Sequence, residues 1–128
     1  VMMSMLRLNI PSVFIYGGSI LPGSYKGKDI TVQDVFEAVG NYSGGIINES
    51  ELEEIEKVAC PSAGSCGGQF TANTMACVSE ALGLALPSST MAPAPYESRD
   101  EYSYEAGLAV MNLLKLGIRP RDIVTLEA

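Results

Sequence analysis

Apolar side chains recur three or four residues apart in five stretches of the sequence, a spacing that predicts amphipathic helices. One stretch begins at Thr31, where Asp34 stands three residues later and completes a capping box. Ser50 and Glu53 repeat this pattern and predict the start of the next helix. We therefore expect helices over residues 1–10, 31–40, 50–59, 70–83 and 100–116.

A continuous apolar run, Val13–Tyr16, lies between Pro11 and the pair Gly17 and Gly18. Such a run predicts a buried strand of a parallel sheet. A helix followed by a strand and a glycine turn is typical of α/β proteins, so the predicted fold is α/β, a fragment of an open parallel sheet flanked by helices. Ligands of such sheets bind beyond the carboxyl ends of strands, where residues 17–19 would lie, although a tight strand exit explains the glycines equally well.

Glycine, proline, serine and asparagine gather between the predicted helices and indicate connecting segments. The final apolar residues are compatible with either a strand or the start of a helix. The first residue is Val1 rather than methionine, and both ends fall in apolar runs, so we expect a piece of a longer chain. The predicted connections are residues 21–30, 41–48 and 87–95, and the undecided segment is 123–126.

The composition narrows the classes of function. The chain has 128 residues, of which 47% are apolar, enough for one domain with a hydrophobic core. Eight basic against 15 acidic residues give a net charge of -7, which argues against a nucleic-acid partner and against an anionic membrane surface. The acidic run in residues 51–56 is interpreted as a solvated helix face rather than a metal site. Histidine is absent, so the usual general base and the commonest metal ligand are missing.

The three cysteines differ in their surroundings, and their odd number indicates a reducing, cytoplasm-like compartment. Cys77 lies within a predicted helix and is interpreted as a small buried apolar residue. Cys60 precedes Pro61 at a helix end, where a packed or capped thiol is the simplest interpretation. Cys66 stands on a Gly/Ser turn just before a helix, whose N-terminus would favour the thiolate. Cys66 is therefore a candidate nucleophile or metal ligand.

The spacing of Cys60 and Cys66, with five residues between them, fits neither a zinc site nor a thioredoxin-like redox pair. A cysteine hydrolase would need a histidine, and three cysteines cannot supply four cluster ligands. If Cys66 is a ligand, either its partners lie partly outside this chain or one metal position stays open. An open position is what a Lewis-acid catalyst requires.

The segment Cys60–Met75 resembles the third cluster-ligand motif of the dihydroxy-acid dehydratase family, and the resemblance extends over essentially all 128 residues. It implies that residues 1–128 are part of the N-terminal iron–sulfur-binding α/β domain, with both ends truncated. By this resemblance Cys66 is the third cluster ligand, which makes it the only cofactor-binding and metal-binding residue assigned in the chain. Supporting matches are Leu6–Ser12, Tyr16–Gly23 and Glu80–Ser89.

The resemblance also implies an activity. The family removes water from 2,3-dihydroxy-3-methyl carboxylic acids and yields 2-oxo acids, a hydro-lyase step of valine, isoleucine and leucine biosynthesis. The implied cofactors are an iron–sulfur cluster, [2Fe–2S] rather than [4Fe–4S], and Mg²⁺. A cytoplasmic homodimer is expected, or an organellar matrix protein in a eukaryote.

The family's remaining functional groups do not align with this chain. These are two further cluster cysteines, a carbamylated lysine, acidic Mg²⁺ ligands and a serine base. Cys60 and Cys77 are not ligands by this alignment, and Lys26, Lys28 and Lys57 are poorly placed for the carbamate. No catalytic residue is assigned, and we expect the isolated fragment to be inactive.

Two other functions remain open. Sugar-acid dehydratases, which act on aldonates or 6-phosphogluconate, resemble one another in a Gly-Thr-Ala pattern after the cysteine. Here Cys66 precedes Gly67–Phe70 and only then Thr71 and Ala72, which is closer to the branched-chain enzyme. A non-catalytic iron–sulfur carrier is the alternative of another class, and reversible one-electron chemistry would distinguish it.

Overall fold

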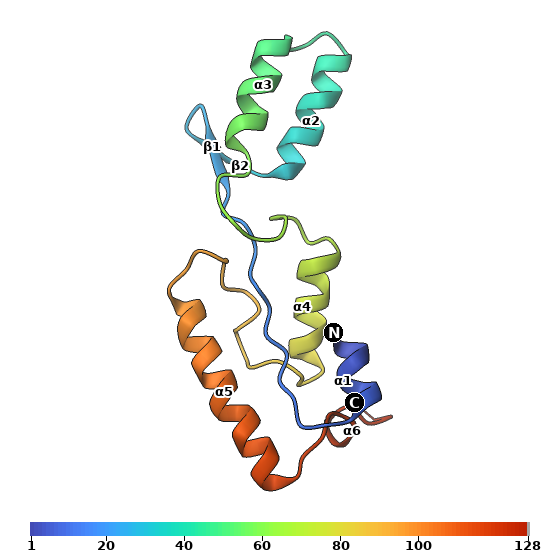
Figure 1. Ribbon diagram of the computed structural model, residues 1–128. Helices are drawn as coiled ribbons and strands as arrows, with labels where there is room; N and C mark the ends of the chain where they lie inside the picture. The colour runs from blue at the N-terminus through green and yellow to red at the C-terminus, as the bar shows by residue number, and fades with distance from the viewer. Residues whose placement is uncertain (128) are drawn as a thin grey trace.

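The structure is a computed structural model and describes residues 1–127, which form two units stacked end to end (Figure 1). The hairpin unit, residues 23–59, contains β1 (Gly23–Tyr25), β2 (Lys28–Ile30), α2 (Val32–Ser43) and α3 (Glu49–Val58). The loop-rich unit, residues 1–22 and 60–127, contains α1 (Met2–Leu8), α4 (Thr71–Ala81), α5 (Ser98–Leu116) and α6 (Pro120–Ile123).

Local side-chain caps begin both helices of the hairpin unit. The capping box at Thr31 is confirmed: its hydroxyl accepts from the Gln33 amide at 3.3 Å, and Asp34 accepts from the Thr31 amide at 2.6 Å. The prediction that Ser50 begins the next helix is wrong. α3 begins at Glu49, because the Asn48 side chain accepts a hydrogen bond from the Glu51 amide at 3.0 Å and caps the helix two residues earlier.

Residues 21–30, predicted as a loop, contain an antiparallel hairpin in which Gly23 pairs with Ile30 and Tyr25 with Lys28. The turn residues Lys26 and Gly27 have φ of 50° and 77°, and two positive φ angles suit the twist of a tight hairpin. The hairpin packs closely on α3. A Cβ atom on Gly23 would lie 1.7 Å from the carbonyl oxygen of Val58, so only glycine allows this approach.

The predicted open parallel sheet is not confirmed, and the fold is mainly helical with a small antiparallel sheet. Val13–Tyr16 is not a strand, because Phe14 makes a single parallel bridge with Ala85 and Ile15 is 51% exposed. Ser19 and Ser65 form a second single parallel bridge. Each bridge stands alone, so no ladder of consecutive hydrogen bonds forms on either side of it.

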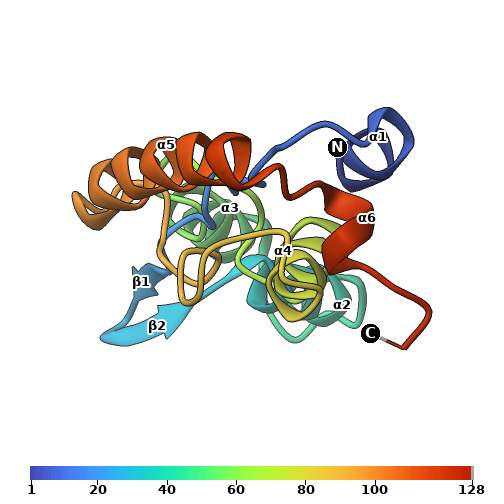
Figure 2. The same ribbon diagram turned by 90° about the horizontal axis from the view of Figure 1, so that it is seen from below.

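The helices of the loop-rich unit lie close to their predicted positions. α4 begins at Thr71, and α5 begins at Ser98, two residues earlier than predicted. α5 ends at Leu116 and is capped by Gly117 in the left-handed conformation. The segment 123–126, which the sequence left undecided, starts at Ile123, the last residue of the short helix α6. α6 lies beside α1 in both views (Figure 1, Figure 2). None of the helices in residues 1–127 is long and apolar enough to span a lipid bilayer.

Candidate functional site

Cys66 belongs to the segment that connects α3 to α4. This connecting segment runs through the region where the two units meet (Figure 1). Its thiol is free and half-buried, and Sγ lies 3.9 Å from the carbonyl oxygen of Gly68. The N-cap of α4 is Phe70, so Cys66 precedes the helix by five residues instead of occupying its first turn. The sulfur is therefore presented by a turn, which we call the Cys66 turn (residues 64–68).

Long-range backbone hydrogen bonds hold the Cys66 turn against the segment after Tyr16. The Ser65 amide donates to the Gly18 carbonyl at 3.0 Å, and the Ile20 amide donates to the Ser65 carbonyl at 2.7 Å. Gly64 has φ of 136°, and a Cβ atom there would lie 2.4 Å from the Ile20 nitrogen. The structure thus brings together two features that the sequence analysis singled out, the glycine pair and the cysteine turn.

Three polar side chains, Tyr16, Ser65 and Asn73, form a network beneath this turn, which we call the turn network. Asn73 Nδ2 donates to the carbonyl oxygens of Cys66 at 2.9 Å and Gly68 at 2.6 Å. Asn73 Oδ1 accepts from the Tyr16 hydroxyl and from Ser65 Oγ at 3.3 Å. The Tyr16 hydroxyl also contacts Ser65 Oγ.

The sequence analysis missed the turn network. Tyr16 and Asn73 are 57 positions apart, and no local spacing relates them. Nothing local marked out Asn73, because Thr71 and Thr74 in the same turn of α4 are polar as well.

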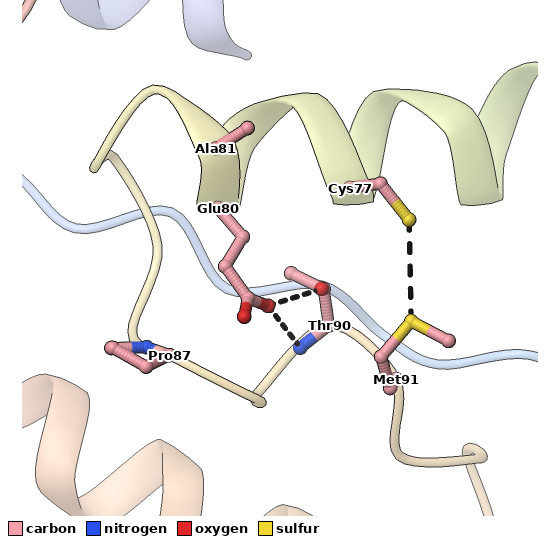
Figure 3. A pocket seen from close by; sticks show the side chains of 6 residues that line it. All are labelled: Cys77, Glu80, Ala81, Pro87, Thr90 and Met91. Carbon is pink, nitrogen blue, oxygen red and sulfur yellow. Dashed lines mark hydrogen bonds between the residues drawn. The ribbon is translucent and has the colours of Figure 1, made fainter.

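The other two cysteines are not where the sequence analysis placed them. Cys60 is exposed rather than packed, because the preceding Ala59 occupies the buried position at the end of α3 and is 1% exposed. Cys77 is half-buried rather than part of the core, since Ala76 and Ser79 take the buried positions of α4. The Cys77 sulfur faces Met91 Sδ at 4.0 Å (Figure 3).

Two cavities lie beside α4. A cavity of about 120 Å³ with a mixed polar and apolar lining adjoins the Cys66 turn through Gly67, but Cys66 does not line it. A larger and more open cavity of about 460 Å³ shares Cys77, Thr90 and Met91 with the smaller one (Figure 3). The smaller cavity is lined by Ser19, Gly67, Gln69, Asn73, Cys77, Thr90 and Met91, and the larger by Cys77, Glu80, Ala81, Pro87, Thr90 and Met91.

Glu80 holds the loop that borders both cavities. Its carboxylate accepts from the Thr90 hydroxyl and from the Thr90 amide at 3.4 Å (Figure 3). It also accepts from the Ser88 amide at 2.6 Å. These hydrogen bonds, led by that of the Thr90 hydroxyl, hold the pKa of Glu80 below its usual value. The carboxylate therefore acts as a clamp on residues 88–90.

Arg99 holds the same loop from the first turn of α5. Its buried side chain donates from Nη1 to the carbonyl oxygens of Ser89 at 2.7 Å and Ala92 at 3.3 Å. The loop in turn reaches the glycine-pair segment, because the Ala94 amide donates to the Ser19 carbonyl at 2.8 Å. One connected set of hydrogen bonds therefore runs from α5 to the neighbourhood of the Cys66 turn.

Donor chemistry limits what the chain alone can bind. Within residues 1–127 no three His, Cys, Asp or Glu side chains lie close enough together to hold a metal ion. A free, half-buried thiol on a turn fits one ligand of an iron–sulfur cluster, for which cysteine sulfur is the usual donor. The acidic residues of α3 do not fit a Mg²⁺ site, since Glu51 and Glu53 pair with Lys26 at 2.7 Å and Lys57 at 3.1 Å on the surface.

Comparisons with known proteins show which family the sequence resembles. The sequence model of the dihydroxy-acid/6-phosphogluconate dehydratase N-terminal family matches residues 1–128. A dihydroxy-acid dehydratase of Parvibaculum lavamentivorans is 72% identical over 127 residues, and one of Pelagibacter ubique is 72% identical over 124 residues. They are matched over 99% and 97% of this chain and 22% of their own length.

A more distant relative, the dihydroxy-acid dehydratase of Sulfurisphaera tokodaii, is 57% identical over 127 residues, which are 99% of this chain and 23% of that protein. The chain thus spans less than a quarter of the length of these relatives. The match nevertheless includes the Cys66 turn, the glycine pair and the whole of α4 and α5. The chain therefore belongs to the dihydroxy-acid/6-phosphogluconate dehydratase family, whose N-terminal region it matches throughout.

Proposed function

We propose that this chain is part of the N-terminal iron–sulfur-binding domain of a dihydroxy-acid dehydratase and that Cys66 is the one cluster ligand that residues 1–128 contribute. The observation that carries the proposal is the free, half-buried Cys66 thiol on a glycine turn. The three relatives described above are all named dihydroxy-acid dehydratases, which favours dihydroxy acids over sugar acids as substrates. The full-length protein would convert 2,3-dihydroxy-3-methyl carboxylic acids to 2-oxo acids in branched-chain amino-acid biosynthesis.

The role of the chain is to hold one sulfur donor in a fixed place. An iron–sulfur cluster with an open iron position would supply a Lewis acid for the C3 hydroxyl, which is otherwise a poor leaving group. The chain contributes the Cys66 sulfur and a backbone that fixes it, through Ser65 bonded to Gly18 and Ile20. The other cluster ligands, the Mg²⁺ ligands and the base belong in this proposal to parts of the protein outside residues 1–128.

Three further properties are part of the proposal. The cluster is [2Fe–2S] rather than [4Fe–4S], and Mg²⁺ holds the substrate's carboxylate and C2 oxygen. The full-length protein is a homodimer that works in the cytoplasm. The net charge of -7 supports a small-molecule enzyme without a nucleic-acid partner.

Substitution of Cys66 in the full-length protein tests the proposal. We expect Cys66→Ala and Cys66→Ser to lose the visible absorbance of the cluster and the dehydration of 2,3-dihydroxy-3-methylbutanoate. Cys60→Ser is the matched control, because that thiol is exposed six positions earlier in the chain. It should keep both the absorbance and the activity.

Retention of cluster and activity by Cys66→Ala would contradict the assignment. Two other results would redirect it. Faster turnover of aldonates or 6-phosphogluconate than of 2,3-dihydroxy-3-methylbutanoate would make the protein a sugar-acid dehydratase. Reversible one-electron transfer without any dehydration would make it a carrier.

A further inference from the structure

We infer that Asn73 is a positioning residue that sets the direction of the Cys66 sulfur, with Tyr16 and Ser65 orienting its amide. The inference rests on the proposed role of Cys66 as a cluster ligand. Asn73 itself does not contact the sulfur. It acts through the backbone of the Cys66 turn, by hydrogen bonds to the carbonyl groups of Cys66 and Gly68.

The position of Asn73 makes it a rigid reference point for the turn. It is the third residue of α4, so its backbone is fixed by the helix while its side chain reaches back over the preceding turn. The two bonds from Nδ2, at 2.9 Å and 2.6 Å, fix the peptide groups that follow Cys66 and Gly68. Fixing these groups restrains the backbone that carries the Cys66 side chain and thus the place where its sulfur can meet iron.

The network requires an amide at residue 73. One atom must donate two hydrogen bonds to carbonyls, while the other must accept from the hydroxyls of Tyr16 and Ser65. These acceptor contacts also fix the amide against a flip, because a reversed amide would set its oxygen against two carbonyl oxygens. Aspartate has nearly the same shape but cannot donate, so it retains the packing and loses both bonds to the turn.

The two hydrogen bonds from Asn73 go to backbone oxygens and leave the Cys66 sulfur available for a metal. The contact of Cys66 Sγ inside the turn is the long one of 3.9 Å to the Gly68 oxygen. Asn73 donates to that oxygen at 2.6 Å and so offsets its partial negative charge next to the sulfur. Without this donor, the carbonyl would favour the more oxidised, less negative state of a bound cluster.

The test compares variants of the full-length protein with its cluster loaded. We expect Asn73→Asp and Asn73→Ala to lose iron to a chelator about 10- to 100-fold faster than the unmodified protein, as is usual for groups that orient a metal ligand. Asn73→Asp should also lower the midpoint potential of the cluster and change the electron paramagnetic resonance spectrum of the reduced cluster. Tyr16→Phe removes one support of the amide and should accelerate iron loss only about threefold.

Asn41→Asp is the matched control, because it makes the same chemical change at an exposed position of α2. It should leave iron loss, potential and spectrum unchanged. Thermal unfolding of each apoprotein measures any general loss of stability. The inference predicts that Asn73→Asp alters potential and spectrum more than its apoprotein melting temperature explains.

The outcomes separate this inference from the proposed function. If Cys66→Ala abolishes the cluster but both Asn73 variants show the original iron loss, potential and spectrum, the positioning role is overturned and Cys66 remains a ligand. A positioning role is also overturned if iron loss only follows a lower apoprotein melting temperature with an unchanged spectrum. If Cys66→Ala keeps its cluster, the proposed function itself fails.

Discussion

The hairpin unit and the loop-rich unit are held together in different ways. In the hairpin unit, a tight turn and two N-caps are determined by residues next to one another in the chain. In the loop-rich unit, Phe14 bonds to Leu84 and Ser65 to Gly18, over tens of residues of sequence. Cys66 belongs to the loop-rich unit. The candidate ligand is therefore positioned by long-range contacts, which can be changed one at a time.

Two glycines with positive φ, one in each unit, show the difference between a local turn and a long-range contact. Gly27 stands in the hairpin turn with φ of 77°, and a Cβ atom there would meet nothing within 4 Å. Gly64 has φ of 136°, and a Cβ atom there would collide with the backbone of Ser19 and Ile20. The first glycine satisfies only a local angle, whereas the second allows two distant segments to touch.

Gly64→Ala should therefore have a much greater effect on stability than Gly27→Ala. Backbone strain and overlap with a neighbouring main chain together should lower the local free energy of opening by about 3 kcal/mol or more. Hydrogen exchange of the peptides that cover residues 59–70 in the full-length protein measures this change. Gly27→Ala is the control and should cost only about 1 kcal/mol, in the hairpin peptides alone. Equal effects of the two substitutions would remove the distinction between the units.

Arg99→Met tests the clamp on the loop that borders both cavities. The variant keeps most of the side-chain volume but leaves the carbonyl groups of Ser89 and Ala92 without their donor, and we expect a loss of about 2 kcal/mol. Hydrogen exchange should rise in residues 86–95 and remain unchanged in the hairpin unit. Arg7→Met, at an exposed position of α1, should change stability by less than about 0.5 kcal/mol. Unchanged exchange in residues 86–95 would show that the loop is held without Arg99.

Glu80→Gln should reveal a pH dependence in the same loop. The pKa of Glu80 is lower in the folded protein than in the unfolded chain because the Thr90 hydroxyl and the Ser88 amide donate to the carboxylate. Its stabilising effect is thus fully present above the unfolded pKa of about 4.5 and is lost as the pH falls through the lower folded pKa. At pH 7 the variant should be less stable by about 1 kcal/mol.

Thermal unfolding of the two apoproteins at several pH values measures this difference. The gap between the original protein and Glu80→Gln should be widest near pH 7 and should narrow toward pH 3. A gap that is constant with pH would mean that the carboxylate's charge does not contribute to holding residues 88–90.

The contrast between the units also shows how much the sequence could predict. Helices were predictable because their signals are local: Thr31 with Asp34 at the start of α2, and Gly117 at the end of α5. Val13–Tyr16 was predicted as a strand because a short apolar run is typical of a buried strand. Whether such a run pairs along its length depends on distant segments, and here only Phe14 finds a parallel partner.

The candidate site divides in the same way. Cys66 could be singled out from its glycine-rich surroundings and from the resemblance to a known motif. Asn73 and Tyr16 could not, since their contact exists only after two segments separated by 57 positions come together. Cys77 was assigned to the core because apolar residues lie near it in the sequence. The sequence pattern does not reveal that Cys77 faces Met91 in a loop rather than a second helix.

The start of α3 offers the finest test of local prediction, because two residues of similar capping ability compete for it. The sequence favours Ser50 with Glu53, whereas the structure uses Asn48, whose side chain accepts from the Glu51 amide at 3.0 Å. Asn48→Ala should therefore cost about 1 kcal/mol, measured as faster hydrogen exchange in the first turn of α3. Ser50→Ala should be nearly neutral, since residue 50 lies inside the helix and alanine is the better helix former. The reverse order of effects would place the helix start at Ser50, and α3 would then begin with the capping box of Ser50 and Glu53 that the sequence predicts.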